Sequence, residues 1–211
     1  MNNFKRNMKK LWWFIWEDDS IYSWIVNIIL AFVLIKFIVY PTLGLLLGTG
    51  YPVVAVVSGS MEHDGSFDDW WTSRAVCSVA ACKQKDWYNE KGITKDEFKT
   101  FIFKNGFNTG DIIILLGKKP KDIQIGDVIV FTSNKPYPII HRVTSKRYES
   151  SKIYFETKGD HNQAKGDDDM NISEDNVIGK GVFKIPYLGW IKIGFFKIIE
   201  WPIKIIGNIV G

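Results

Sequence analysis

The longest apolar run of the chain extends from Ile21 to Leu47 and is interrupted by Lys36 and a few small polar residues. A helix of about 20 apolar residues suffices to cross the hydrocarbon layer of a bilayer. Lys36 is costly there unless its long side chain brings the ammonium group to an interface or to a partner. Pro41 can kink or end the helix, which would divide the run into two unequal parts. The pattern predicts one membrane-spanning helix.

The basic residues around this run predict its orientation. Several precede it, whereas no Lys or Arg lies between residues 47 and 60. Cytoplasmic flanks carry the excess of Lys and Arg, so we expect residues 1–20 in the cytoplasm and the chain from residue 51 onward outside. A cleaved signal peptide has a shorter apolar region of about 7 to 15 residues, so a retained anchor is expected over residues 21–47. The preceding basic residues are Lys5, Arg6, Lys9 and Lys10.

Short β-branched runs bounded by turn residues predict a mainly β, antiparallel domain over residues 51–188. Gly110-Asp111 and Gly126-Asp127 each precede such a run, and the two segments are near copies. Repeats of this kind are typical of sheet architecture rather than of a functional site. Further strands are expected near residues 52–57, 139–145, 153–158 and 177–183.

Residues 62–107 lack strong strand alternation and are expected to form an inserted loop and helix segment. Thr94, with Glu97 three positions later, has the pattern of a capping box at a helix start. Phe98 and Phe101 would give this short helix an apolar face.

The chain has two cysteines, Cys77 and Cys82, and both lie in this segment. An oxidising exterior allows a disulfide between them. Two thiols without a nearby histidine pair do not complete a tetrahedral metal site. From the sequence, a disulfide and free thiols both remain open.

The tail from Ile185 to Gly211 is apolar but carries several charges. Lys197, Glu200 and Lys204 fall within about 60° of one another on a helix, which gives a narrow polar stripe. We therefore expect residues 189–211 to form a helix that lies in the membrane surface. A second spanning helix stays open, at the cost of its charges and a proline.

Composition narrows the class of protein. The 211 residues suffice for one domain with a core plus membrane segments. The net charge of +4 is spread along the chain, which excludes a nucleic-acid-binding surface. The 9 tryptophans and 15% aromatic content suit the boundary between membrane and water.

Three places in the chain offer catalytic chemistry. Ser60 lies in a Ser-Gly-Ser-Met-Glu stretch after the run 52–57, His141 lies in a predicted strand, and Asp160 follows another. A serine hydroxyl becomes a nucleophile when a positioned base takes its proton. An imidazole, with an ordinary pKa near ~6.5, can accept that proton and return it, and a carboxylate can hold the ring in the right tautomer. The sequence predicts Ser60, His141 and Asp160 in these roles.

Each of these residues also has an ordinary structural explanation. Ser-Gly-Ser is usually a turn, a strand histidine is often simply packed, and Gly-Asp is common in loops. A metal-dependent hydrolase that uses His63, His141 and His161 lacks a helical His-x-x-x-His pair. Neither a metal nor a cofactor is therefore expected.

The order of these elements resembles type I signal peptidases, specifically their archaeal and endoplasmic-reticulum branch. The resemblance rests on the Ser-Met element after a spanning helix, on His141-Arg142-Val143, and on the Lys-Gly-Asp-x-Asn stretch around Asp160. It covers the anchor, the serine strand and roughly residues 110–188. It implies a signal-peptidase-like β domain and a membrane-bound serine endopeptidase that removes signal peptides from secretory preproteins, cutting after small residues.

The same resemblance implies further site residues. The Ser58 hydroxyl and the Ser60 backbone N–H would be the oxyanion donors, with Gly59 and Met61 also at the oxyanion and substrate-binding site. An extended substrate would pair with the serine strand. The family has a second acidic residue after its Gly-Asp pair, and the candidates here are Asp167, Asp168 and Asp169, of which we expect the first two to be secondary acids.

The chain also departs from the family, because His63 stands where a proline commonly follows the Ser-Met-Glu element. An inactive relative, kept as a structural subunit of a signal-peptide-processing or translocation assembly, is the alternative function. The expected partners are secretory preproteins and the bilayer, and a translocation channel or partner subunits remain open. The expected location is the plasma membrane, or the endoplasmic-reticulum membrane of a eukaryote.

Overall fold

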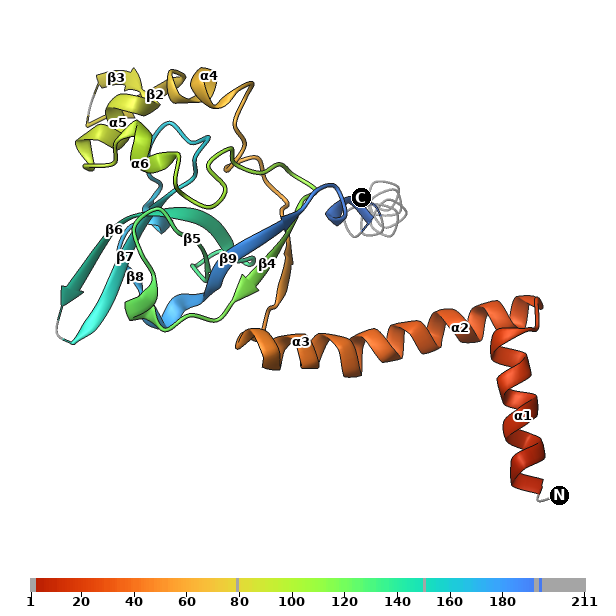
Figure 1. Ribbon diagram of the computed structural model, residues 1–211. Coiled ribbons are helices and arrows are strands. Elements are labelled where there is room, and N and C mark those ends of the chain that lie inside the picture. The colour runs from red at the N-terminus through yellow and green to blue at the C-terminus, as the bar shows by residue number, and fades with distance from the viewer. Residues whose placement is uncertain (1–2, 79, 150, 192–193, 195–211) are drawn as a thin grey trace, which may run out of the picture. The chain divides into compact units, whose positions relative to one another are not determined.

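The computed structural model describes residues 3–78, 80–149, 151–191 and 194 (Figure 1). The chain forms two compact units that divide between Leu46 and Leu47. The expected polar stripe of Lys197, Glu200 and Lys204 lies outside the described residues, as does most of the expected helix over residues 189–211.

The first unit contains α1 (Asn3–Trp16) and all but the last residue of a continuous helix over Ile21–Leu47. That helix comprises α2 (Ile21–Leu34), the π-helical turn η1 (Ile35–Val39) and α3 (Tyr40–Leu47). It is long and apolar enough to cross a membrane. Ser20 caps α2, because its side chain accepts a hydrogen bond from the Ser23 N–H.

Pro41 does not end this helix, although it lacks the N–H that the helical ladder needs. The π-helical turn η1 lies just before it, and the Tyr40 N–H donates to the Ile35 carbonyl. A turn of this kind lets a long helix continue past an interruption in its ladder. The Lys36 ammonium lies 5.7 Å from the ring centre of Phe32 and 5.4 Å from that of Phe37. These cation–π contacts give the charge favourable neighbours within the apolar helix.

The second unit is built on a seven-stranded antiparallel sheet with the order β1-β4-β9-β5-β6-β7-β8. Figure 1 shows that this sheet is strongly curved. The mainly antiparallel β fold with an N-terminal apolar helix is therefore confirmed. The strands are β1 (Val53–Ala55), β4 (Ile112–Leu116), β5 (Val128–Phe131), β6 (Ile139–Glu149), β7 (Lys152–Lys158), β8 (Ile172–Ser173) and β9 (Val177–Ile185).

The two Gly-Asp repeats are sheet architecture, as expected. Gly110 and Gly126 have φ of +90° and +89°, a region that favours glycine, and each turn feeds a strand beside β9. The Asp111 and Asp127 carboxylates each accept a hydrogen bond from the backbone N–H three residues earlier, at 2.9 Å. The same local sequence therefore builds the same turn twice.

Apolar side chains on the inner face of the sheet form the core under the serine element. Val56 is buried in it, and Val54 packs against it, so neither is an obvious substrate contact. Burying one such aliphatic side chain contributes about 1.5–3 kcal/mol. The buried members of this cluster are Val56, Met61, Phe107, Ile113, Leu115, Val128 and Val130.

The inserted segment is more structured than the sequence predicts, because it holds a β-hairpin as well as helices. Thr94 does cap α6, by accepting from the Glu97 N–H at 3.2 Å. An aromatic cluster of its own, including Trp70, Tyr88 and Phe98, fills its interior. The elements are α4 (Phe67–Trp71), β2 (Arg74–Cys77), β3 (Ala80–Lys83), α5 (Gln84–Glu90) and α6 (Lys95–Phe98).

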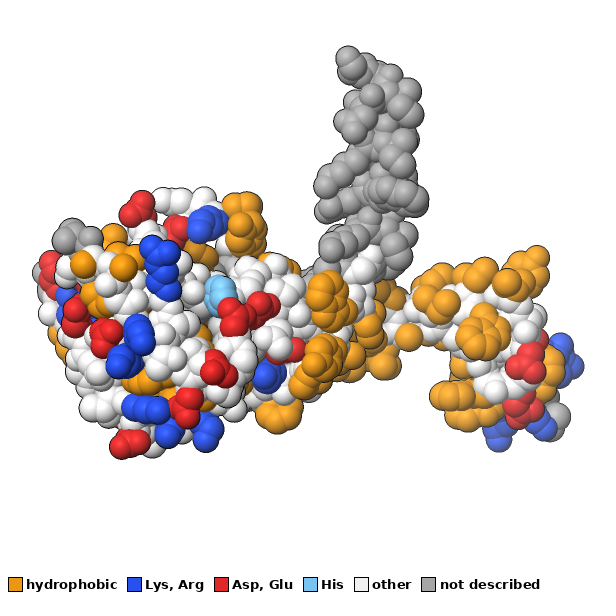
Figure 2. Space-filling model, turned by 90° about the horizontal axis from the view of Figure 1, so that it is seen from above, with side chains coloured by type: hydrophobic (Ala, Val, Ile, Leu, Met, Phe, Trp, Pro, Cys, Tyr) orange, Lys and Arg blue, Asp and Glu red, His pale blue; other side chains and the backbone are white. Residues whose placement is uncertain are grey.

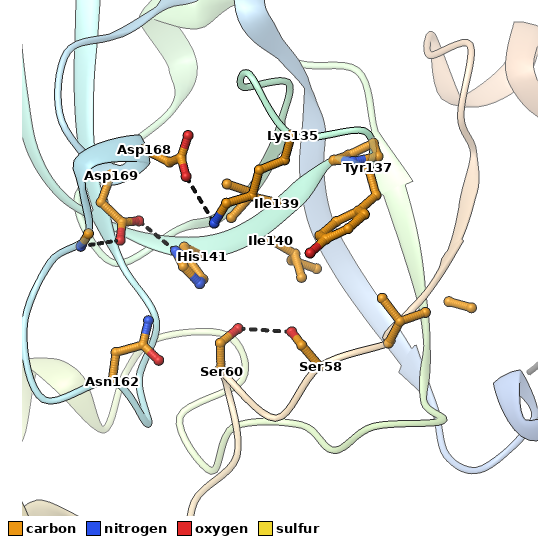
Figure 3. A pocket seen from close by; sticks show the side chains of 14 residues that line it. Ser58, Ser60, Lys135, Tyr137, Ile139, Ile140, His141, Asn162, Asp168 and Asp169 are labelled. Carbon is orange, nitrogen blue, oxygen red and sulfur yellow. Dashed lines mark hydrogen bonds and ion pairs between the residues drawn. The ribbon is translucent and has the colours of Figure 1, made fainter.

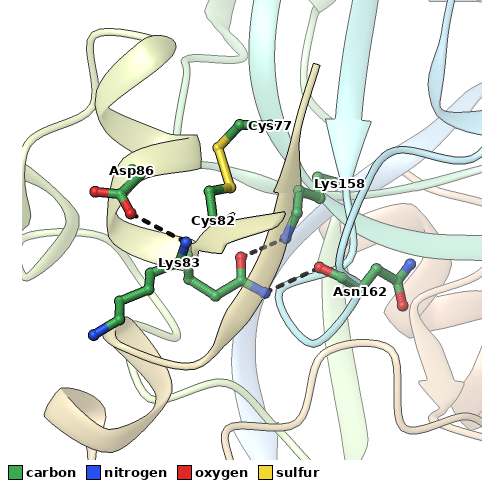
Figure 4. Close-up of a disulfide and its surroundings, with 7 residues drawn as sticks. Cys77, Cys82, Lys83, Asp86, Lys158 and Asn162 are labelled. Atoms are coloured by element: carbon green, nitrogen blue, oxygen red, sulfur yellow. Dashed lines mark hydrogen bonds between the residues drawn. A yellow bond between two sulfur atoms is a disulfide. The ribbon is translucent and has the colours of Figure 1, made fainter. Parts of the chain in front are cut away.

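Cys77 and Cys82 form a disulfide, which decides the alternative that the sequence leaves open (Figure 4). The bond joins β2 to β3, whose register pairs Ala75 with Cys82 and Cys77 with Ala80. The hairpin is therefore closed both by its ladder and by a covalent link.

Candidate active site

Ser60 lies in a turn beyond β1, at the end of an extended stretch. The Val56 N–H donates to the Asp111 carbonyl at 2.9 Å, which ties this stretch to the start of β4. The Ser60 carbonyl accepts from the His161 N–H at 2.9 Å. A Cβ on Gly159 would lie 2.7 Å from that carbonyl, so only glycine permits the contact. The serine is thus held by the loop that follows β7.

His141 lies on β6, opposite Ile129 of β5. Its Nδ1 lies 2.5 Å from Asp169 Oδ1, and both side chains are nearly buried. Asp169 Oδ1 also accepts from the Thr157 hydroxyl at 2.5 Å, and its Oδ2 accepts from the Gly166 N–H at 2.9 Å. Asp169 is therefore held from three directions while it holds the imidazole.

The environment keeps Asp169 ionised. Burial raises the pKa of its carboxyl. The hydrogen bond and charge of His141, together with the hydrogen bond from Thr157, lower this pKa by more than burial raises it, so the net shift is downward. A carboxylate in contact with Nδ1 fixes the tautomer in which Nε2 is free to accept a proton.

Ser60 and His141 line the same cavity, which has a volume of about 250 Å³. Figure 3 shows their side chains facing each other across it, with Asp169 behind the imidazole. The Ser58 hydroxyl lies 3.3 Å from the Ser60 hydroxyl, on the same wall. The sequence-predicted nucleophile, base and oxyanion donor are therefore brought together.

Asp160 does not contact His141, contrary to the sequence-based expectation. Its wholly buried carboxylate is paired with Arg142, whose Nη2 lies 2.7 Å from Oδ2 and whose Nε donates to Oδ1 at 2.9 Å. Burial raises the pKa of Asp160, but the charges and hydrogen bonds of Arg142 and His63 together outweigh it and hold this pKa well below its usual range. Successive residues of a strand point to opposite faces, so His141 and Arg142 cannot share one aspartate.

The other acidic candidates differ in their surroundings. Asp168 lines the cavity, and its Oδ2 lies 2.9 Å from Lys135 Nζ. The hydrogen bond and charge of Asp168 raise the pKa of Lys135. Asp167 accepts a hydrogen bond from the Met170 N–H through its backbone carbonyl. The acidic partner of His141 is Asp169 instead.

Met61, expected at the oxyanion and substrate-binding site, has a wholly buried side chain in the core under the serine element. Its sulfur accepts from the Asp160 N–H at 3.4 Å. Gly59 lies against Glu62, since a Cβ there would be 2.9 Å from the Glu62 carboxylate. The contacts of Met61 are thus structural.

Lys158 is a buried amine two residues before Asp160. Burial lowers the pKa of its ammonium to about 7. Its Nζ donates to Gln84 Oε1 at 2.8 Å and to the Gly159 carbonyl at 3.1 Å, and it does not line the cavity. Within the described part of the chain, no group of three or more His, Cys, Asp or Glu could hold a metal ion.

Asp169 is the site residue that sequence reasoning failed to select. It is the last of three consecutive aspartates, and the sequence alone does not show which of the three contacts His141. The signal was local: Gly166 lies three residues before it, and the carboxylate accepts from that N–H as Asp111 and Asp127 do in their turns. Lys135 and Asn162 also line the cavity and were not predicted.

Known proteins similar to this chain are catalytic subunits of signal peptidase complexes. The SEC11 subunit of Colletotrichum graminicola is 32% identical over 95 residues, which are 41% of this chain and 55% of that protein. The sec11 subunit of Pyrenophora tritici-repentis is 36% identical over 97 residues, 41% of this chain and 54% of that protein. The SEC11 subunit of Scheffersomyces stipitis is 25% identical over 167 residues, 74% of this chain and 73% of that protein.

In the first two alignments the chain spans about half the length of the relative, 55% and 54%. No protein-family model matches the chain. The resemblance to type I signal peptidases of the endoplasmic-reticulum branch is confirmed by these relatives.

Proposed function

We propose that the protein is a membrane-bound serine endopeptidase that removes N-terminal signal peptides from secretory preproteins. The observation that carries the proposal is the cavity shared by Ser60 and His141, with the imidazole held by Asp169 at 2.5 Å. An inactive structural subunit would have no need of a serine, a histidine and a buried aspartate in this arrangement. The names of the similar proteins support the same choice.

The proposed reaction is acyl transfer through the serine. His141 Nε2 takes the proton of the Ser60 hydroxyl as its oxygen attacks the scissile carbonyl. Asp169 keeps the proton of His141 on Nδ1 and stabilises the imidazolium that forms. The imidazolium then protonates the leaving amine, and a water molecule activated by His141 hydrolyses the acyl-enzyme. This assigns to Asp169 the role that the sequence suggested for Asp160.

The oxyanion of the tetrahedral intermediate requires donors that are already in place. The Ser58 hydroxyl, 3.3 Å from the Ser60 hydroxyl, and the Ser60 backbone N–H are the proposed donors. Such a pair of donors stabilises charge that develops only in the transition state, which is what raises turnover.

An extended substrate would bind along the edge strand and the wall of the cavity. Among the described strands β1 pairs only with β4, so its other edge can accept an extended chain. Apolar side chains of Ala55, Val57 and Ile140 line the cavity beside the serine.

Membrane attachment is part of the proposal, because it would hold the site where preproteins emerge. The helix Ile21–Leu47 is the proposed anchor, with residues 1–20 in the cytoplasm and the catalytic unit on the other side. The similar proteins are subunits of complexes, so partner subunits, and contact with a translocation channel, are part of the proposal. Figure 2 shows acidic and basic side chains interspersed on the second unit, which does not suit nucleic acid.

The test is cleavage of a defined preprotein by the purified full-length protein in lipid vesicles. We expect a cut after a signal peptide that ends in Ala, located by mass spectrometry of the product, and no change on adding a chelator. The same preprotein with Phe before the cut is the control and should resist cleavage. No cleavage of the Ala substrate, or cleavage abolished by the chelator, would contradict the proposal.

A further inference from the structure

The inserted segment, residues 62–107, surrounds the buried ion pair behind the active site. Asp160 Oδ2 lies 3.0 Å from His63 Nε2, and Oδ1 accepts from the Tyr88 hydroxyl at 3.0 Å. A buried carboxylate is costly unless it is paired and its hydrogen bonds are complete. Arg142 supplies the charge, and the segment supplies the remaining side-chain donors.

Arg142 is enclosed by the same segment. Its Nη1 donates to the Ile102 carbonyl at 3.1 Å, and its Nη2 donates to the Phe103 carbonyl at 2.9 Å. The guanidinium carbon lies 4.6 Å from the ring centre of Phe98, which is a favourable place for a cation. Both members of the ion pair therefore depend on residues 62–107.

The segment also holds the backbone of the loop that follows β7. Three backbone carbonyls within residues 160–163 accept hydrogen bonds from the segment. Trp70 Nε1 donates to the Asp160 carbonyl at 2.9 Å, and Gln84 Nε2 donates to the Asn162 carbonyl at 3.0 Å. The Val76 N–H of β2 donates to the Gln163 carbonyl at 2.9 Å. Figure 4 shows the hydrogen bond to Asn162, close to the hairpin that carries the disulfide.

This loop touches the catalytic groups at both ends. The His161 N–H holds the Ser60 carbonyl at 2.9 Å, and Asn162 lines the cavity. The chain then continues to Gly166, whose N–H holds Asp169. A shift of residues 160–163 would move the serine on one side and the aspartate behind His141 on the other.

We propose that residues 62–107 are a clamp that positions the catalytic groups by holding residues 160–163, and that the Cys77–Cys82 disulfide keeps this clamp closed. The proposal rests on the proposed function for its kinetic effect. The positioning residues are His63, Trp70 and Tyr88, which act through Asp160 and do not touch substrate. Misplacement of catalytic groups lowers turnover steeply, whereas the β1 edge and the apolar cavity wall that would bind substrate are outside the clamp.

The first test compares hydroxyl deletions at two tyrosines in the full-length protein. Tyr88→Phe removes a donor to the buried Asp160, and we expect kcat to fall about tenfold, the size of one lost hydrogen bond to a charged group, with KM unchanged. Tyr148→Phe is the matched control, since Tyr148 is 71% exposed on β6, and it should leave kcat unchanged. An unaltered kcat in Tyr88→Phe, or a rise in KM alone, would overturn the proposal.

His63 allows a rescue experiment. His63→Leu removes the donor to Asp160 and should lower kcat by about tenfold. His63→Gln offers an amide N–H at a similar reach and should restore most of that loss. If both variants are equally inactive, or if neither loses activity, the claim that His63 positions the catalytic groups through Asp160 is wrong.

Reduction tests the disulfide and separates this proposal from the proposed function. The chain has two cysteines, so any effect of dithiothreitol that is absent in the Cys77→Ser, Cys82→Ser double variant belongs to this bond. We expect reduction to lower kcat and to speed amide hydrogen exchange in peptides that cover residues 160–163. The exchange needs no substrate, so it tests the clamp even if the wild type cleaves no preprotein. Unchanged exchange on reduction would contradict the clamp.

Discussion

His141 and Arg142 are neighbours on β6, and each holds a different aspartate on a different face of the sheet. His141 Nδ1 lies 2.5 Å from Asp169 Oδ1, and Arg142 Nη2 lies 2.7 Å from Asp160 Oδ2. The alternation of side chains along a strand makes this division unavoidable. One aspartate orients the proposed base, and the other neutralises a buried guanidinium.

Replacing Asp169 should therefore lower the rate of the catalytic step. Asp169→Asn should lower turnover by about 10⁴, the size expected when a triad aspartate loses its charge and the tautomer is lost. The fold should survive, because the amide can still accept from the Gly166 N–H. Initial rates of preprotein cleavage measure the effect, and Asp168→Asn, at a carboxylate that also lines the cavity but pairs with Lys135, is the control that should cost far less. A larger loss in the control would move the catalytic role to Asp168.

Replacing Asp160 should affect stability. Asp160→Asn leaves the Arg142 charge buried without its partner, which should lower the free energy of unfolding by about 3–5 kcal/mol. Denaturant unfolding of the protein in detergent, followed by tryptophan fluorescence, measures this change. A variant as stable as the wild type would show that the buried pair is not needed for folding.

Lys158 predicts a pH dependence of stability. Its pKa is lowered to about 7 in the folded protein, whereas an unfolded lysine titrates near ~10.4. Between these values the unfolded chain binds one more proton, so the free energy of unfolding should rise with pH from about 7 to 10, by up to about 1.4 kcal/mol per pH unit. Lys158→Met should remove this slope, as measured by denaturant unfolding at several pH values. A slope equal to that of the wild type would show that other groups cause it.

The proposed topology predicts the side from which protease acts. Trypsin added to sealed right-side-out vesicles should cut within the inserted segment around residues 83–104, where exposed lysines such as Lys104 lie. Basic residues of α1 should be protected until the vesicles are opened. Cleavage in α1 with protection of the segment would invert the orientation.

The sequence predicted the parts of the fold that depend on local pattern. The Gly-Asp turns, the strands that follow them and the long apolar helix all carry periodic or turn signals that need no distant partner. Ser60 and His141, which the structure places on one cavity, were proposed because the order of their motifs resembles that of type I signal peptidases. The hairpin β2–β3 was missed because its strands are four residues each and rich in alanine, which has weak β propensity.

The partner of His141 was missed for a different reason. Asp160 follows the strand that pairs with β6, so it was correctly placed near that strand. The face of the sheet that it reaches depends on the path of the loop after Lys158, which the inserted segment fixes through contacts remote in sequence. Such non-local contacts have no signature in a single sequence.

Turnover of a preprotein by Ser60→Ala tests the central claim most directly. The hydroxyl is the proposed nucleophile, and loss of a triad nucleophile typically costs about 10⁶ in turnover. The variant should remain folded and inserted, because the contacts of residue 60 with the loop after β7 run through its backbone. We predict no detectable cleavage above background by Ser60→Ala at concentrations where the wild type completes the reaction. Near-normal turnover by the purified variant would contradict the account.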